Sequence, residues 1–264
     1  MAKVKEVLHF LDRLAPMHMK MDFDNVGLLV GRGTAEVSKI LVALDVTQGV
    51  IDEAKEMGAE LIVGHHPLTY TPMKAIVDND LCGNKILDLI EHKIATICMH
   101  TNLDSAEGGI NDVLAYVFGL RDTMVLNEQG KEDGKPYGLG RAGYLEAPMS
   151  LADFLPRAKA TVKTKGLRYY DAGRPVHKVG VMGGSGTNEL AYAVQAGCDT
   201  YVVGEVKYNA FLDAREYGIN LIEADHFCTE SLILAPLAKM LVKEFPEISV
   251  SVSKTQGQAL DFFV

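Results

Sequence analysis

A strand–helix–strand pattern between Lys39 and Gly64 constrains the fold of this chain most strongly. Residues 40–44 form an apolar run of strand length, and residues 50–57 have helical spacing. Gly58 is placed to end that helix, and a second apolar strand follows at 61–63. Two strands joined through a helix by short connections are typical of a parallel sheet covered by helices. The sequence therefore predicts an α/β fold.

Similar periodic segments continue along the chain. Helical spacing predicts helices at 3–14, 84–91, 110–118, 188–195, 209–217 and 231–245. Apolar runs predict further strands at 94–99, 140–146, 167–170, 178–182, 200–203, 220–223 and 248–252. The segment from Asn127 to Tyr137 is polar and rich in turn-forming residues, which predicts an exposed loop or a domain boundary.

Two parts of the chain share one order of elements. The segments from Lys39 to Gly64 and from Lys178 to Gly204 both contain a lysine, an apolar strand, a helix, a second apolar strand and a glycine. This order favours a degenerate internal duplication. Two unrelated strand–helix–strand units would produce the same pattern, so both interpretations stay open.

The composition excludes several classes of protein. The 264 residues are 48% hydrophobic, enough to bury a sizeable core in one large or two small domains. A net charge of −9 argues against nucleic-acid binding as the main function, because phosphate neutralisation needs clustered Lys and Arg. The four cysteines form no CxxC pair, and no apolar run is long enough to span a membrane. We therefore expect a cytoplasmic protein with reduced thiols.

Two adjacent histidines follow the strand at 61–63. Gly64 precedes His65 and His66, and Pro67 then prevents further regular pairing. Neighbouring residues on an extended chain point to opposite sides, so two imidazoles make a poor core pair. They can instead reach two neighbouring metal ions. A surface turn that contains two histidines is the alternative.

Two later strand ends carry further metal-ligating residues. His100 and Asp104 follow the strand at 94–99, and His226 and Glu230 follow the strand at 220–223. In open α/β sheets the functional crevice lies outside the carboxyl ends of the strands. His226 and Glu230 are four residues apart at a helix start and share one face, whereas Cys228 faces away and is expected to pack in the core. Three strand ends together favour a metal site over coincidence.

The donor set indicates the kind of metal site. Three imidazoles and two carboxylates are too many for one structural tetrahedral site, and the set lacks thiolates. A carboxylate can bridge two cations, so the set suits a two-metal centre. Nitrogen and oxygen donors are compatible with Zn, Fe, Mn, Co or Ni. His100, in a segment expected to be non-helical, is assigned to orienting a ligand or a substrate.

Two other features are ambiguous at the level of sequence. The Gly183–Gly186 loop, between a strand and a helix, can present backbone N–H groups to a phosphate or can serve as a tight packing turn. Glu205 occupies the position of the histidines in the second repeat. It either approaches the site or caps a turn, and we favour the turn cap.

The motifs in combination resemble the NIF3-like family of dinuclear metal-centre proteins, often labelled GTP cyclohydrolase 1 type 2. The resemblance covers nearly the whole chain and rests on segments 24–31, 64–67, 100–104, 183–186 and 226–230. It implies that two divalent ions are held by His65, His66, Asp104, His226 and Glu230. It also implies a homohexameric toroid with the sites facing inside. The chain resembles the short form of the family, because the middle contains only a loop where long members carry an inserted domain.

The resemblance also implies the architecture. We expect two similar α/β lobes with mixed sheets flanked by helices and a metal cleft between them. Residues 1–125 with 227–264 are predicted to form the first metal-binding lobe, and residues 126–226 the second. The chain departs from the family pattern at Tyr208-Asn209, where many relatives have Tyr-His, and at 223–225, where Asp-Ala-Gly is usual. The first departure puts any substrate role of the missing histidine in doubt.

Two functions from different classes follow. The first is a metal-dependent hydrolase acting on a small-molecule or nucleotide substrate, in which Glu230 bridges two cations about 3.5–4 Å apart and His100 transfers protons. The family label implies hydrolytic opening of the guanine imidazole ring of GTP with loss of formate. The second is a non-catalytic metal-binding scaffold, metal-handling protein or regulator. The ligand set is shared by both, so turnover by the metal-loaded protein discriminates between them.

Overall fold

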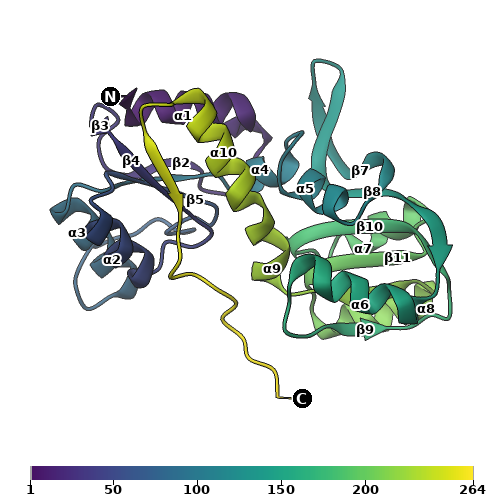
Figure 1. Ribbon diagram of the computed structural model, residues 1–264. Helices are drawn as coiled ribbons and strands as arrows, with labels where there is room; N and C mark the ends of the chain where they lie inside the picture. The colour runs from purple at the N-terminus through teal and green to yellow at the C-terminus, as the bar shows by residue number, and fades with distance from the viewer. Residues whose placement is uncertain (1, 264) are drawn as a thin grey trace. The chain divides into compact units, whose positions relative to one another are not determined.

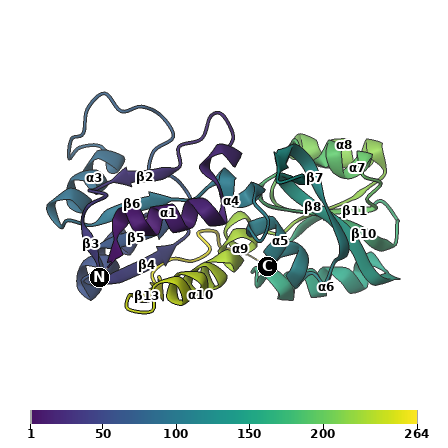
Figure 2. The same ribbon diagram turned by 90° about the horizontal axis from the view of Figure 1, so that it is seen from above.

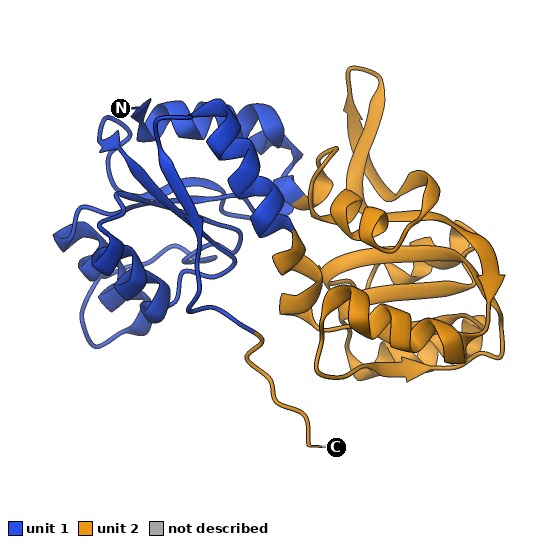
Figure 3. Cartoon of the chain, viewed as in Figure 1, with its two compact units in different colours: residues 1–103, 233–257 blue, residues 104–232, 258–264 orange. Residues whose placement is uncertain are grey.

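Helices flank mixed β-sheets throughout the computed structural model, which describes residues 2–263 (Figures 1 and 2). The predicted α/β class is confirmed. The chain divides into two units, residues 1–103 with 233–257 and residues 104–232 with 258–264 (Figure 3). Within residues 2–263, none of the helices combines the length and the apolar character needed to cross a bilayer.

Unit 1 is built on a five-stranded sheet in the order β13-β4-β5-β6-β2, in which β2 alone is antiparallel to its neighbour. Its strands are β2 (Gly27–Val30), β4 (Lys39–Ala43), β5 (Leu61–Gly64), β6 (Ala95–Cys98) and β13 (Ser249–Val252), with a small separate pair formed by β1 (Ala2–Lys3) and β3 (Glu36–Val37). Its helices are α1 (Val4–Leu14), a 3-10 turn (Met17–Met19), α2 (Gln48–Met57), α3 (Leu81–Glu91) and α10 (Leu234–Glu244).

The central strands of this sheet carry apolar residues on both faces, and helices cover both faces. Leu41 and Ala43 of β4 pack with Val50 and Ile51 of α2 and with Leu89 of α3. The opposite face carries α1 and α10 (Figure 1). Such two-sided burial explains why β4, β5 and β6 are continuous apolar runs rather than alternating ones.

Unit 2 is built on a six-stranded sheet in the order β7-β8-β10-β11-β12-β9. Its strands are β7 (Arg121–Glu132), β8 (Lys135–Met149), β9 (Arg168–Tyr170), β10 (Val176–Ser185), β11 (Thr200–Glu205) and β12 (Asn220–Glu223). Its helices are α5 (Ile110–Val117), α6 (Leu151–Val162), α7 (Leu190–Gln195), α8 (Tyr208–Tyr217) and α9 (His226–Glu230). A 3-10 turn at Ser231–Ile233 spans the boundary where the chain returns to unit 1. The short helix α4 (Thr101–Ser105) contains the boundary between the units.

The two sheets repeat one arrangement. In unit 1, β4, β5 and β6 are parallel neighbours, and the antiparallel β2 flanks β6. In unit 2, β10, β11 and β12 are parallel neighbours, and the antiparallel β9 flanks β12. The flanking strand precedes the parallel strands along the chain in both units. This shared order supports the internal duplication over two unrelated strand–helix–strand units.

The unit boundaries differ from the residues expected at 125/126 and 226/227. The first boundary falls at 103/104, because Leu114 and Phe118 pack in the same core as Val179 and Val181 of β10. The chain returns to unit 1 at 232/233, because α9 packs against β10 and β11.

The segment from Asn127 to Tyr137 is not the predicted loop. It forms the tip of a β-hairpin in which β7 and β8 pair antiparallel as far as Glu132 and Lys135. Asp133 and Gly134 both have positive φ, 48° and 78°, as a two-residue hairpin turn requires. This hairpin tip is exposed and therefore polar. A polar segment rich in turn-forming residues was interpreted as a loop for that reason.

The buried carboxyl group of Glu189, just before α7, provides a stability prediction. Glu189 is buried, and this burial raises the pKa of its side chain above the ordinary Glu value. The folded state therefore holds a proton that the unfolded state releases, and stability falls as pH rises above the unfolded-state pKa of about 4.3. Metal-free Glu189→Gln is expected to melt a few degrees above the wild type at pH 7, and the gain should vanish near pH 4.

Thermal unfolding of both proteins in chelator at the two pH values measures this difference. The exposed Glu216→Gln provides the control, with no expected change at either pH. An equal gain for Glu189→Gln at both pH values would show that the buried charge is not its cause.

Candidate metal centre

Two histidines of unit 1 stand directly after β5. His65 is buried, and its Nδ1 lies 2.7 Å from the carbonyl oxygen of Met99. The Nδ1 of His66 lies 2.8 Å from a carboxylate oxygen of Asp45. The two ring centroids are 4.8 Å apart. Both imidazoles are therefore oriented by an oxygen atom on their Nδ1 side.

His100 joins them from the end of β6. Its Nδ1 lies 2.8 Å from Asp24 Oδ1, and the other carboxylate oxygen of Asp24 accepts hydrogen bonds from the backbone N–H and the hydroxyl of Thr101. Burial alone would raise the pKa of Asp24, but the hydrogen bonds from His100 and Thr101 outweigh it and hold that pKa far below the usual range. Asp24 is thus a carboxylate. One ligand atom from each of His65, His66 and His100 lies within 4.8 Å of the other two.

Helix α9 carries the ligand pair of unit 2. His226 Nε2 lies 3.1 Å from Glu230 Oε2, and His226 Nδ1 lies 3.0 Å from Glu205 Oε2. Asp104 offers a carboxylate oxygen within 4.8 Å of one from Glu230, and both of these side chains are buried. His226 thus has an oxygen atom beside its Nδ1, as each of the three histidines in unit 1 does.

These contacts identify one protonated nitrogen in each ring. Carbonyl oxygens and carboxylates accept hydrogen bonds, so each Nδ1 donates. The Nε2 atom of His226 also lies 3.1 Å from Glu230 Oε2, a contact that a bound cation would replace. A histidine that donates Nδ1–H to a carboxylate or carbonyl is the common arrangement for a metal ligand bound through Nε2. The nitrogen and oxygen donors in both units thus fit divalent transition metals.

In each unit, a parallel strand is followed by a histidine and, four residues after it, by a carboxylate. The last printed pairs are Gly64 with Cys98 and Val203 with Glu223, so His100 stands two residues beyond the paired end of β6 and His226 three residues beyond that of β12. The segment containing Asp104 is helical, contrary to the expectation from sequence, and forms α4.

The glycine loop at the end of β10 lies against the ligands of unit 2. Gly184 has φ +64°, and a Cβ atom there would lie 2.0 Å from Glu230 Oε1 and 3.2 Å from His226 Nε2. The backbone N–H of Gly184 also donates to the hydroxyl of Thr229. Of the two interpretations of this loop, the tight packing turn is the one that these contacts support.

Asp225, before α9, has the unusual backbone conformation φ 75°, ψ 131°. Most residues avoid positive φ, which fits the glycine usual at this position in the resembling family. The Asp225 side chain compensates by accepting hydrogen bonds from Cys228 N and from the Gln258 amide. Asn209, the other departure, is exposed on α8 and its side chain contacts that of Asp213.

Three acidic residues that orient the histidines were not identified from sequence. Thr47 caps α2, and the carboxylate of Asp45 lies beside Nδ1 of His66. Glu205 binds His226 rather than capping a turn, and Asp24 binds His100. Glu205 follows its strand in the second repeat at the position that the histidines occupy in the first, and this correspondence was the available signal for its role. Cys228, as predicted, packs in the core of unit 2, where burial raises its pKa to about 12.

The family model for Duf34/NIF3 (NGG1p interacting factor 3) matches residues 2–258. This chain belongs to that family. The predicted resemblance is thereby confirmed.

Curated relatives cover the same span. A "GTP cyclohydrolase 1 type 2 homolog" of Clostridium perfringens is 33% identical over 262 residues, which are 98% of this chain and 99% of the relative. A protein of the same name from Clostridium acetobutylicum is 37% identical over 240 residues, or 90% of this chain and 89% of the relative.

Solved structures share the fold. A Bacillus cereus protein related to NIF3 superimposes with a TM-score of 0.94 at 25% identity, covering 100% of this chain and 99% of the other. Reduced HcgD from Methanocaldococcus jannaschii gives a TM-score of 0.82 at 27% identity, covering 96% and 98%. The predicted pair of α/β lobes with mixed sheets is therefore the fold of the family.

Proposed function

We propose that this protein binds two divalent metal ions through His65, His66, Asp104, His226 and Glu230 and acts as a metal-dependent hydrolase. One observation carries the proposal: four histidines each donate Nδ1–H to a carbonyl or carboxylate oxygen, which directs Nε2 toward a ligand. The names of the relatives favour a nucleotide-like substrate and the GTP cyclohydrolase 1 type 2 class.

Two of the three unit boundaries lie close to proposed ligands along the chain. The boundary at 103/104 runs between His100 and Asp104, and the boundary at 232/233 follows Glu230 by two residues.

The residues have distinct proposed roles. When bound, a pair of divalent cations lowers the pKa of coordinated water and stabilises negative charge on the substrate. Glu230, whose carboxylate offers two oxygens, would be the ligand shared by the two ions. His100 accepts a proton on Nε2 while the carboxylate of Asp24 stabilises the imidazolium that forms, since Asp24 already accepts Nδ1–H.

We also propose that the protein works as a cytoplasmic homohexamer, as the family resemblance implies, without a membrane or nucleic acid as partner. The net charge of −9 supports the last point. The oligomeric state is measured by light scattering.

Two measurements test the proposed function. Elemental analysis under metal-replete conditions should find two metals per chain, and clearly fewer would contradict the dinuclear proposal. Metal-loaded protein should turn over GTP or a member of a phosphoester panel, and the His66→Ala/Glu230→Ala variant should lose that turnover. Activity that survives in the double variant would exclude these residues from catalysis. Tight metal binding without turnover on any substrate would favour the non-catalytic scaffold.

A further inference from the structure

Asn111, in the first turn of α5, connects the backbone of Asp104 to the loop that contacts Glu230, the two proposed carboxylate ligands of unit 2. Its side chain is fully buried. The Nδ2 amide donates to the carbonyl oxygen of Asp104 at 2.9 Å, and Oδ1 accepts from the backbone N–H of Gly183 at 3.0 Å. A carbonyl can only accept and an N–H can only donate, so the orientation of the amide is unambiguous.

Gly183 in turn lies against the side chain of Glu230. A Cβ atom on Gly183 would lie 3.3 Å from Glu230 Cγ, so the loop backbone lies directly against that side chain. The next residue, Gly184, borders the Glu230 carboxylate itself. Asn111 therefore links the main chain of one proposed ligand to the loop that confines the other, through two hydrogen bonds shielded from water.

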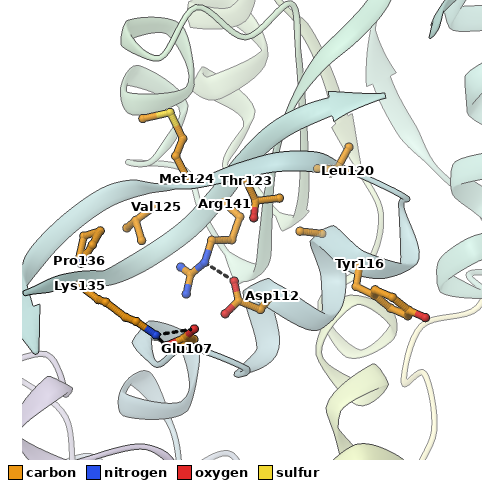
Figure 4. A pocket seen from close by; sticks show the side chains of 11 residues that line it. Glu107, Asp112, Tyr116, Leu120, Thr123, Met124, Val125, Lys135, Pro136 and Arg141 are labelled. Atoms are coloured by element: carbon orange, nitrogen blue, oxygen red, sulfur yellow. Dashed lines mark hydrogen bonds and ion pairs between the residues drawn. The ribbon is translucent and has the colours of Figure 1, made fainter. Parts of the chain in front are cut away.

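Arg141 of β8, which Figure 4 shows paired with Asp112, also holds the turn that follows Asp104. Its Nη2 donates to the carbonyl oxygens of Ser105 and Ala106, which directly follow Asp104. Its Nε pairs with Asp112, whose other oxygen accepts the backbone N–H of Gly108 at 2.6 Å. The side chain is 4% exposed, which makes these interactions resistant to solvent screening.

The neighbouring cavity of about 430 Å³, lined by Arg141, Asp112, Lys135 and Glu107, does not offer an anion site. The two remaining N–H groups of Arg141, on Nη1, donate to the carbonyl oxygens of Gly138 and Gly140. All five donors of this guanidinium are thus engaged by the protein. Lys135 pairs with Glu107 in the same view (Figure 4). The role of Arg141 is therefore to hold backbone, not to bind ligand.

We propose that Asn111 is a positioning residue of the metal centre, which sets the placement of Asp104 relative to Glu230, with Arg141 as a second support. This inference rests on the proposed metal binding. Residues that orient metal ligands typically contribute about 10–100-fold to metal affinity. Asn111 acts through backbone atoms, so its loss should weaken metal binding without removing any ligand atom.

Asn111→Asp provides the test. Aspartate has the same shape and still accepts from Gly183 N–H, but it presents an oxygen to the Asp104 carbonyl where the amide donated. The dissociation constants for Zn²⁺ and Co²⁺, measured by competition with a chelator, should rise about 10–100-fold. The absorption spectrum of the Co²⁺ form should also change, because the coordination geometry is altered.

Asn220→Asp is the matched control. Asn220 is equally buried in unit 2, donates to the Arg174 carbonyl and accepts from the backbone N–H of Ala172. It has no contact with a proposed ligand, so its replacement should lower the melting temperature of the metal-free protein while metal affinity stays within twofold. Wild-type affinity in Asn111→Asp, or an equal loss in Asn220→Asp, would overturn the inference.

Arg141→Lys keeps the inference testable should Asn111→Asp fail to fold. Lysine cannot reproduce the forked contacts to Ser105 and Ala106, so metal affinity should fall several-fold. Unchanged affinity in Arg141→Lys would likewise contradict the positioning role. A wild-type protein that binds no metal would instead refute the proposed function itself, so the two failures are distinguishable.

Discussion

Glu230→Gln is expected to reduce the bound metal from two ions per chain to one or none. Glutamine preserves the volume of this buried side chain but removes the charge, and its amide group cannot bridge two cations. Elemental analysis after gel filtration in metal-free buffer measures the loss. Two metals retained per chain would exclude Glu230 as a bridging ligand.

The stability of the metal-free variant separates ligand loss from unfolding. The buried Asp104 and Glu230 carry ligand oxygens within 4.8 Å of each other, and Glu230 Oε2 also lies 3.1 Å from His226 Nε2. Glutamine weakens an unfavourable and a favourable contact together, so metal-free Glu230→Gln should melt near the wild-type temperature. Added Zn²⁺ should raise the melting temperature of the wild type and not that of the variant.

Glu205→Gln is the graded control for this prediction. Glutamine at 205 can still accept the Nδ1–H of His226 through its amide oxygen. Metal affinity should fall, but by less than in Glu230→Gln, because a neutral acceptor orients the imidazole while adding less to its basicity. An equal loss in both variants would indicate that Glu205 itself binds metal.

Gly184→Ala is expected to damage both the fold and the metal centre. The new Cβ would lie 2.0 Å from Glu230 Oε1, so the carboxylate or the loop must move. The φ of +64° adds about 1–2 kcal/mol for any L side chain. The overlap adds about 1–3 kcal/mol, as overpacking does elsewhere. Denaturant unfolding of the metal-free protein and chelator competition measure the two effects.

Gly218→Ala is a close control, because Gly218 has φ +65° and a Cβ there would meet no atom within 4 Å. It should cost only the backbone contribution, about 1–2 kcal/mol, and leave metal affinity unchanged. If the two alanine variants lose equal stability and both keep wild-type affinity, Gly184 is not needed to accommodate Glu230.

The parallel strands were predictable because their signals are local. Residues 40–44 and 61–63 are continuous apolar runs with helical spacing and a terminating glycine between them, so they identify a buried strand–helix–strand unit without tertiary information. The hairpin at 127–137 was missed for the opposite reason. Its exposed strands are polar, and their pairing depends on a partner strand rather than on burial.

The candidate histidine ligands were predictable because they closely follow strands in the sequence. His65, His66, His100 and His226 were all selected because each stands beyond the carboxyl end of a strand. Their acidic partners were not, since Asp24 lies 76 residues from His100 and acquires its role only through folding.

The sequence by itself determined the α/β class, the family, the repeated order of elements and the histidines and carboxylates available for metal binding. These follow from periodicity and motif, which are properties of neighbouring residues. Only the tertiary structure decided which oxygen atom lies beside Nδ1 of each histidine and the function of the Gly183–Gly184 turn. It alone also revealed the link through Asn111. Hydrogen bonds and close approaches between distant segments exist only once the sheets have formed.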